Sequence, residues 1–102
     1  MVYLIVVLVA KDVDDVAELL KLLATQVRLS REEPGCLRFE AYESQSVPGT
    51  FFVVEQWESE AALDQHRQAE AITTVYVPRI LPLVDRYLHV CSVLAGRSVS
   101  GL

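Results

Sequence analysis

The sequence predicts a single α+β domain of the ferredoxin-like type, a split β-α-β-β-α-β arrangement around an antiparallel sheet. Three observations lead to this prediction. The chain has 102 residues, enough to bury the core of one domain without disulfides or metals. More than half of the residues are apolar. Four segments have the residue pattern of strands, and two segments with helical spacing separate them in the order given.

The segment from 33 to 68 is the clearest part of this pattern, because it predicts a strand, a turn, a strand and a helix in succession. Pro-Gly pairs at 34–35 and 48–49 mark two tight turns, since proline presets φ and glycine accepts a positive φ. Residues 36–44 alternate between two faces, as in a strand. The return strand, Phe51 to Glu58, is rich in β-branched and aromatic residues. We therefore expect a β-hairpin followed directly by a helix.

The N-terminal part predicts a strand and then a long amphipathic helix. Val2 to Val9 is apolar at odd and even positions, which is typical of a strand covered on both faces. Asp12 is placed to cap the helix, and apolar residues then recur at helical spacing from Val13 to Val27, about five turns. Three leucines widen this stripe beyond what one sheet face requires: Leu19, Leu22 and Leu29. The excess points to a pocket or a subunit contact.

The C-terminal part predicts more helix and a last strand. Ser59 is the expected N-cap of the second helix, which we expect to break or bend at 68–70. The apolar stripe continues to Leu83 but is interrupted by Pro78, which lacks a backbone donor. We therefore expect two short helices or one kinked helix. One possible position for Pro78 is the first turn of a helix. Tyr87 to Leu94 alternates as the last strand should.

Residues 1–96 are thus expected to form one domain and residues 97–102 a tail. Right-handed crossovers place the strands in the order 4-1-3-2, with both helical segments on one face of the sheet. The other face is largely apolar and has no segment to cover it, so we expect a homodimer joined through the open sheet faces. Cys36 and Cys91 fall on the two outer strands, too far apart for a disulfide within one chain.

Charge and spacing exclude several classes of partner. The net charge of −5 leaves no surplus of cations for phosphates, so we expect neither a nucleic acid nor an anionic membrane surface as partner. The apolar residues 1–10 lack a basic region and are too short to span a bilayer. The cysteines have no CxxC spacing and His89 has no ligand neighbour, so we expect no built-in metal site. A cytoplasmic protein with reduced thiols is expected.

Three segments, in order and at the right separations, carry a resemblance to a known family. They are EPGCLRFEAYES, PGTFFVVEQW and ESEAALDQH, all within residues 33–66. With them the sequence resembles the antibiotic biosynthesis monooxygenase family of dimeric α+β barrels. The resemblance implies enzymes that oxidise phenolic or hydroquinone rings with O₂ and no added cofactor, beside relatives that degrade haem or isomerise small metabolites. The first strand lacks the Asn of haem-degrading relatives, and Val53 replaces the Asn of some polyketide-ring oxidases. We therefore expect no haem degradation.

Glu55 and Trp57 are the first candidates for a functional site, because alternation places them on one strand face. If this face points inward, Glu55 is a carboxylate in apolar surroundings, which raises its pKa and suits a general base. The alternative is an ion pair with Arg38 or Arg79. Trp57 either stacks on a flat substrate or fills the core.

The second helix and the segment after it supply further candidates. His66 lies on the buried edge of its helix, where it either contacts substrate, holds a proton or orients Glu55, or serves a structural role. Tyr76 and Arg79 are one helical turn apart. Either both face the cavity, or they form a pair on the surface at a subunit edge. For Arg79 we favour the surface position. We assign catalysis to Glu55 and His66, and substrate binding to Trp57, Tyr76, Phe39 and Arg79.

The function that this reasoning favours is a small cofactor-independent monooxygenase acting on a phenolic or hydroquinone-type aromatic with O₂. The sequence has no glycine-rich phosphate loop, no nucleophile elbow and no Cys/His nucleophile pair, so no nucleotide or flavin cofactor is expected. Two alternatives stay open. One is a non-catalytic dimeric barrel that binds a small apolar ligand, and the other is a small-metabolite isomerase on the same fold.

Overall fold

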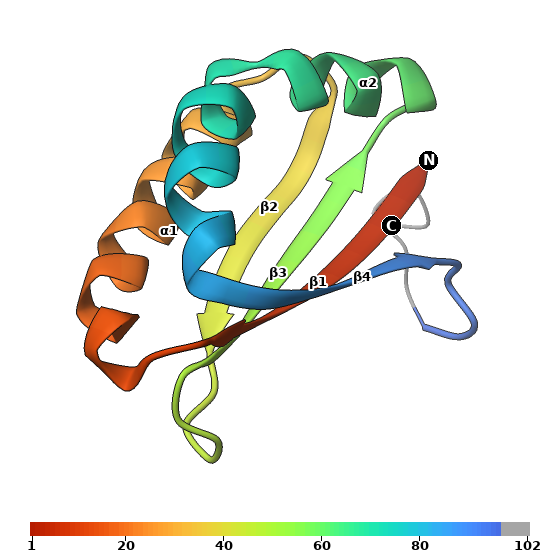
Figure 1. Ribbon diagram of the computed structural model, residues 1–102. Coiled ribbons are helices and arrows are strands. Elements are labelled where there is room, and N and C mark those ends of the chain that lie inside the picture. Colours follow the sequence, from red (N-terminus) through yellow and green to blue (C-terminus); the bar gives the residue numbers. More distant parts are fainter. Residues whose placement is uncertain (97–102) are drawn as a thin grey trace.

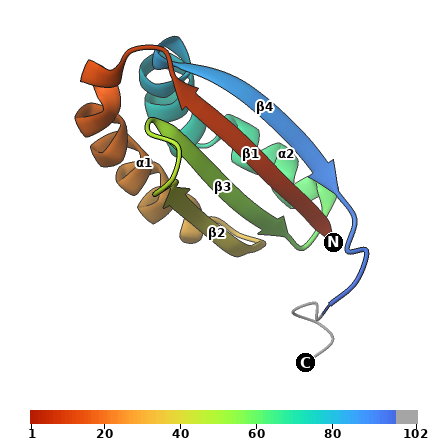
Figure 2. The same ribbon diagram turned by 90° about the horizontal axis from the view of Figure 1, so that it is seen from below.

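The computed structural model describes residues 1–96, and the predicted tail at 97–102 lies outside the described residues. Four antiparallel strands form one sheet in the order β2-β3-β1-β4, and they lie side by side in Figure 2. The bounds are Val2–Ala10 for β1, Cys36–Glu43 for β2, Thr50–Trp57 for β3 and Val84–Cys91 for β4. The predicted α+β ferredoxin-like fold and its strand order are confirmed.

The first crossover is a helix that begins with a tighter turn than expected. Residues Val13–Asp15 form a 3-10 turn, η1, before the α-helix α1 runs over Val16–Arg31. As predicted, Asp12 caps this turn, since its Oδ1 accepts the backbone N–H of Asp14 at 2.9 Å. The carboxylate satisfies a donor that the start of a helix leaves free.

The second crossover consists of three helical segments, α2, η2 and η3, and its break at Ala69 lies where residues 68–70 were expected to break or bend the helix. Helix α2 spans Glu60–Gln68, and the hydroxyl of Ser59 caps it by accepting the backbone N–H of Ala62 at 3.1 Å. After the extended Ala69 the chain forms a π-helix, η2, over Ala71–Ile80, and a 3-10 turn, η3, over Leu81–Leu83. Pro78 lies inside η2 and not in its first turn.

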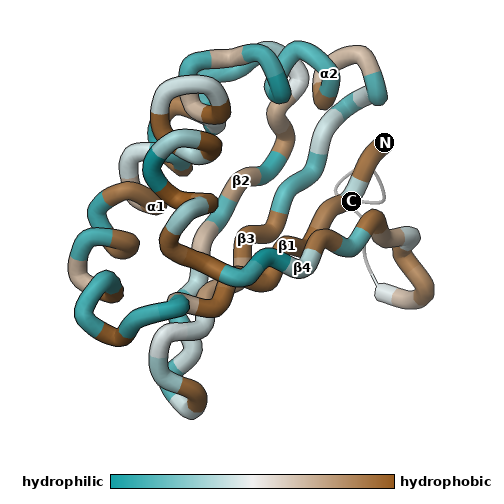
Figure 3. Tube along the Cα trace, viewed as in Figure 1, coloured by the Kyte–Doolittle hydropathy of each residue, from teal (hydrophilic) through white to brown (hydrophobic). Residues whose placement is uncertain are grey.

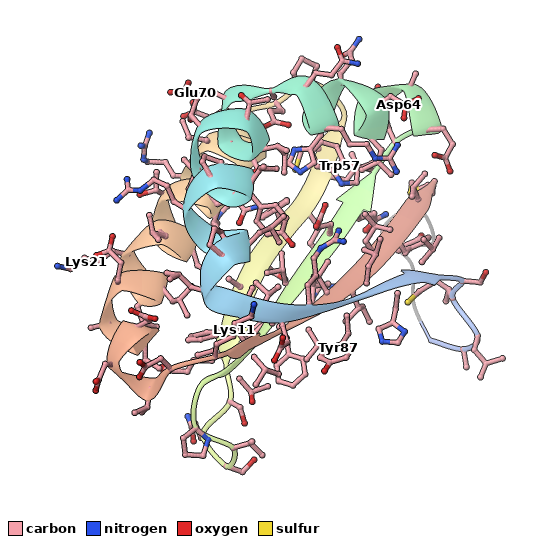
Figure 4. The ribbon with its side chains drawn as sticks, viewed as in Figure 1. Lys11, Lys21, Trp57, Asp64, Glu70 and Tyr87 are labelled. Carbon is pink, nitrogen blue, oxygen red and sulfur yellow. The ribbon has the colours of Figure 1, made fainter. Side chains whose placement is uncertain are left out.

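All helices lie on one face of the sheet (Figure 1). Strand β1 is hydrophobic along most of its length (Figure 3). Its even-numbered side chains point towards the helices and are buried in the core: Val2, Leu4, Val6 and Leu8. Among residues 1–96 no helix covers the opposite face, which is still apolar. Ile5 at its centre is 40% exposed and Tyr87 on β4 is 55% exposed, pointing away from the helices (Figure 4).

The position of the last strand corrects the sequence prediction. Strand β4 begins at Val84, three residues earlier than expected, because Val84 pairs with Ala10 at the end of β1. It ends at Cys91, which pairs with Tyr3, close to the start of β1. Leu94 lies outside the sheet and is 99% exposed.

Candidate active site

A cleft of about 280 Å³ lies between the inner side of the sheet and the segments α2, η2 and η3. It exists because α1 packs on β2 and η2, which leaves the inner side of β4 without a helix directly above it. Leu88 and Val90 point to this side, since they pair with Val6 and Leu4, yet they are 43% and 74% exposed. Most of the wall is apolar, as in sites that bind small organic molecules.

Glu55 and His66 both line this cleft. Strand β3 places Glu55 on the helix-facing side, opposite Leu4 of β1 and Phe39 of β2. Helix α2 begins just past the end of that strand and brings His66 back over it. The Nε2 atom of His66 lies 3.9 Å from Oε1 of Glu55, and both side chains are almost fully buried. The predicted acid–base pair therefore lies together in one site.

Trp57 holds the two groups in place from below. Its indole N–H donates to Oε1 of Glu55 at 3.0 Å, and its ring packs against the imidazole of His66 with centroids 4.4 Å apart. Figure 4 places Trp57 beneath α2. The ring of Phe39 completes this aromatic support, with centroids 5.6 Å from His66 and 6.3 Å from Trp57. The orientation of the imidazole is thus fixed by packing on two sides.

A second carboxyl group, that of Glu33, reaches the other nitrogen of the imidazole. Its Oε1 lies 2.6 Å from Nδ1 of His66, which is a short hydrogen bond. Glu33 follows the end of α1 and precedes the Pro-Gly turn, so that turn aims its side chain at α2. The result is a line of three titratable groups, Glu33, His66 and Glu55, of which Glu33 is nearest to solvent at 14% side-chain exposure.

Burial dominates the charge states of these groups. It raises the pKa of Glu55, an effect that the Trp57 hydrogen bond, the charge of Arg86 and, when the ring is protonated, the charge of His66 partly offset. Burial also raises the pKa of Glu33 to about 7. It lowers the pKa of His66, against the opposing pull of Glu55. Near neutral pH the imidazole is therefore uncharged, and the carboxyl groups on either side of it hold protons more readily than ordinary glutamates.

Tyr76 and Arg86 form the other polar part of the cleft wall. The Nε–H of Arg86 donates to the phenol oxygen of Tyr76 at 2.7 Å, and the guanidinium lies 5.8 Å from the centre of the tyrosine ring. Burial raises the pKa of Tyr76, and the charge of Arg86 opposes this. The pair places a positive charge and a phenol at a cleft that also contains two acids, so it can hold an oxygen atom that becomes negative.

Three residues predicted to bind substrate do not reach the cleft surface. Trp57 and Phe39 are 0% and 1% exposed and pack beneath His66, because α2 covers the end of β3 where they lie. Arg79 is on the outer surface, where its guanidinium pairs with Glu18 of α1 at 3.1 Å. The sequence argument assumed that Tyr76 and Arg79 share a helix face. In the π-helix η2 the wider turn rotates side chains that are three residues apart away from each other. The expectation that Tyr76 and Arg79 share a helix face is therefore wrong.

Sequence reasoning missed three residues of the site, namely Glu33, Arg86 and Gln26. Glu33 is separated from His66 by 33 positions, so no local pattern connects them. Arg86 was missed because the last strand was predicted to begin one residue after it. Gln26 lies on the buried side of α1, and an amide in an apolar stripe was a signal that could have been noted.

Within residues 1–96 no group of three or more His, Cys, Asp or Glu side chains is placed to hold a metal ion. Both nitrogens of His66 already face carboxyl oxygens, so the imidazole has no free position for a metal. In the same part of the chain no helix is long and apolar enough to cross a membrane. The chemistry that this arrangement supports is proton transfer to and from a small, largely apolar ligand.

Fold and site together define a small α+β domain with a ligand-sized cleft and a buried carboxyl–imidazole pair. The family model for antibiotic biosynthesis monooxygenases matches residues 1–76, three quarters of the chain. The chain therefore belongs to the antibiotic biosynthesis monooxygenase family, as the sequence resemblance implied.

Two solved structures of similar fold carry the name of this family. A crystal structure of an antibiotic biosynthesis monooxygenase is 29% identical, with a TM-score of 0.83 over 93% of this chain and 100% of that chain. A Deinococcus radiodurans protein provisionally named for the same family is 27% identical, with a TM-score of 0.80 over 97% of this chain and 96% of that chain. An uncharacterised protein of Synechocystis is 38% identical over 55 residues, a match that covers 54% of this chain and 37% of that protein. The chain thus matches only a little over a third of the length of this curated relative.

Proposed function

We propose that this protein is a cofactor-independent monooxygenase that oxidises a phenolic or hydroquinone-type aromatic small molecule with O₂. The observation that carries the proposal is the buried Glu55, whose pKa is raised, beside an uncharged imidazole in an apolar cleft. A carboxyl group whose pKa is moved towards neutrality takes a proton from a hydroxyl group and releases it again near neutral pH. Apolar walls suit a flat aromatic ring.

In the proposed reaction, Glu55 or His66 removes the hydroxyl proton of the substrate. The resulting anion passes one electron to O₂, which gives superoxide and a ring radical. The two combine at a ring carbon that bears hydrogen and form a peroxide anion, which takes back the proton held by Glu55 or His66 and becomes a hydroperoxide. Loss of water then breaks the O–O bond and leaves a carbonyl on that carbon. One oxygen atom enters the product, the other leaves as water, and the substrate supplies all the electrons.

The protein would contribute proton transfer, positioning and exclusion of water. Glu33 lies beyond His66 and nearer to solvent, so it can hold the proton next to His66 until the peroxide anion takes a proton back. Arg86 and Tyr76 offer positive charge and a phenol hydrogen to the developing oxyanion. A dry cleft keeps the radical pair together until it recombines.

The proposal includes a homodimer formed through the open sheet faces. Its support is the apolar character of that face, where large side chains are between about a third and a half exposed: Ile5, Phe52, Tyr42 and Tyr87. A monomer would leave this surface in water, at a cost that grows with its area.

One observation favours a second candidate, a non-catalytic barrel that binds a small apolar ligand. Trp57 donates a hydrogen bond to Glu55 and is itself fully buried, which is also what a purely structural network would look like. The raised pKa of Glu55 argues for the enzyme, because a structural carboxylate is usually paired with a cation that lowers its pKa.

The test is oxygen uptake and quinone formation from naphthohydroquinone by wild type, Glu55→Gln and His66→Ala. Glu55→Gln keeps an acceptor for the Trp57 N–H but cannot act as a base, so we expect activity to fall by about 10²–10⁴-fold while the protein stays folded. Glu43→Gln, the same change at an exposed position of β2, is the matched control and keeps wild-type activity.

Thermal melting of the same variants separates catalysis from structure. If the pair is structural, the substitutions lower the free energy of unfolding by about 1–3 kcal/mol, because a buried partner loses its hydrogen bond. Full activity in both variants with unchanged melting would show that these residues take no part in the mechanism. The non-catalytic barrel that binds a small apolar ligand would then be the better-supported function.

A further inference from the structure

Gln26 contributes a buried side-chain amide to the wall of the cleft. It lies on α1, is 2% exposed and lines the cleft that contains Glu55 and His66. Its Oε1 is buried and has no hydrogen-bond partner among residues 1–96. A buried polar atom without a partner costs free energy, so it requires an explanation such as a ligand that supplies the missing bond.

The other polar groups at the cleft differ from Gln26, because the protein itself provides their partners. Glu55 accepts from Trp57, and His66 bonds Glu33. Likewise Tyr76 accepts from Arg86. An amide can also exchange its oxygen and nitrogen by a half-turn of its last bond, so Gln26 can present an acceptor or a donor to the cleft.

Ser30, one turn further along α1, provides a comparison. Its hydroxyl is also buried without a partner among residues 1–96, and the side chain is 0% exposed. Unlike Gln26, Ser30 is not part of the wall of this cleft. The two residues therefore share burial and an oxygen without a partner, and they differ in that Gln26 borders the cleft and Ser30 does not.

We propose that Gln26 is a substrate-binding residue that selects an aromatic with a second hydroxyl group. One hydroxyl is deprotonated at Glu55 and His66, and the second donates its hydrogen to the amide oxygen of Gln26. This inference rests on the proposed function and narrows it, since it favours hydroquinone-type substrates over simple phenols. A substrate that lacked the second hydroxyl would leave the amide without a partner, which is a strong basis for selectivity.

The test is equilibrium binding without oxygen, so that turnover does not interfere. Trp57 is the only tryptophan of the sequence and packs against His66, so its fluorescence reports ligand entry. The two probes are naphthohydroquinone and its monomethyl ether, in which one hydroxyl is blocked. Wild type is expected to bind the hydroquinone about tenfold more tightly than the ether, the ratio expected for one hydrogen bond.

Gln26→Met keeps the approximate volume and removes the hydrogen bond. We expect it to bind the hydroquinone about tenfold more weakly than wild type and no better than the ether. We also expect the free variant to melt at the same temperature as wild type or higher, because an unpartnered buried group has been removed. Ser30→Ala is the matched control: it removes the other unpartnered group and leaves both dissociation constants unchanged.

Unchanged binding of the hydroquinone by Gln26→Met would overturn the inference, as would an equal loss in Ser30→Ala or no binding of either probe by wild type. Binding and oxidation are measured separately, so the two proposals can fail separately. A wild-type preference that Gln26→Met loses, in a protein that consumes no oxygen, supports the role of Gln26 and rejects the monooxygenase. If wild type oxidises the hydroquinone and Gln26→Met binds it as tightly as wild type does, the monooxygenase is supported and the role of Gln26 is rejected.

Discussion

The imidazole of His66 lies between two carboxyl groups and against two aromatic rings. Its Nδ1 shares one proton with Glu33 across 2.6 Å. When Glu33 holds that proton, Nε2 carries the other and points it towards Glu55. When Glu33 is ionised, Nδ1 carries the proton and Nε2 becomes an acceptor. The protonation state of Glu33 therefore sets whether His66 can accept a proton on the cleft side.

The first prediction follows from the pKa of Glu33, which burial raises from 4.5 to about 7. The folded protein holds this proton more tightly than the unfolded chain, so the contribution to stability is fully present below pH 4.5 and is lost as the pH rises through about 7. The shift corresponds to an upper limit of about 3–4 kcal/mol, and screening by solvent around the side chain reduces this value. Glu33→Gln should therefore gain stability relative to wild type as the pH is raised over this range.

Thermal melting of wild type, Glu33→Gln and the Glu43→Gln control across this range is the measurement. The difference between curves is what matters, because burial lowers the pKa of His66 and gives it the opposite effect: its neutral form stabilises the fold above pH 6.5, and this contribution is lost as the pH falls. A constant difference between Glu33→Gln and wild type would show that Glu33 does not hold a proton in the folded state.

At the scale of elements, the join between the hairpin and α2 sets the position of His66. Gly35 has φ of +81°, and its carbonyl accepts the backbone N–H of Glu58 at 2.9 Å, which ties the start of the hairpin to the entry of the helix. A Cβ at Gly35 would lie 2.5 Å from the Cβ of Ala62 on α2. The close approach of backbone and helix therefore requires glycine here, for steric reasons in addition to the positive φ.

The second prediction compares Gly35→Ala with Gly49→Ala. Both positions have positive φ, so both changes cost about 1–2 kcal/mol of backbone strain. At Gly49 the added methyl meets Ala10 at an ordinary 3.5 Å, whereas at Gly35 it collides with α2. Urea denaturation should show a clearly larger loss for Gly35→Ala, together with reduced activity, since α2 must move and His66 moves with it.

Ala62→Gly tests the cause of that difference. Alone it lowers stability by about 1 kcal/mol, because glycine is unfavourable inside a helix. Combined with Gly35→Ala it removes the collision, so the double variant should be more stable than the sum of the two single losses predicts. If the two losses in stability are additive, the contact between positions 35 and 62 does not determine the position of α2 above the sheet.

The sequence predicted the elements well and the site only in part, for reasons visible in particular residues. Caps and turn residues act locally, so Asp12, Ser59 and the two Pro-Gly pairs located α1, α2 and the hairpin correctly. Alternation also placed Glu55 on the inner face. Both ends of β4 were misplaced, because they depend on its pairing with β1, from Ala10–Val84 to Tyr3–Cys91, and no local pattern encodes that pairing.

Depth and contacts between distant segments could not be obtained from periodicity. Alternation gives the face on which Trp57 lies, but not that α2 covers it completely. Glu33 is the first residue of one of the three family-like segments, but the sequence predicted no role for it. Its contact with His66 depends on how the turn at Gly35 meets α2. The α-helical spacing assumed for Tyr76 and Arg79 failed because that segment is a π-helix.

At the scale of the whole molecule, the helices within residues 1–96 all lie on one face of the sheet (Figure 1). The third prediction is that wild type is a dimer in light scattering at micromolar concentration. Ile5→Glu, which puts a charge at the centre of the open face, should give a monomer or an unstable protein. Leu20→Glu, at a similarly exposed position on α1, is the control and should remain a dimer. A stable folded wild-type monomer would contradict the proposed assembly.

The central claim is that the cleft inserts an oxygen atom from O₂ into a hydroquinone with the help of Glu55 and His66. The most direct measurement is mass spectrometry of the product formed from naphthohydroquinone under heavy-isotope oxygen gas. We expect wild type to form a hydroxylated naphthoquinone with one heavy oxygen atom, and Glu55→Gln to give only the unlabelled quinone and hydrogen peroxide of the protein-free reaction. Unlabelled quinone and peroxide from wild type, at the protein-free rate, would contradict the account.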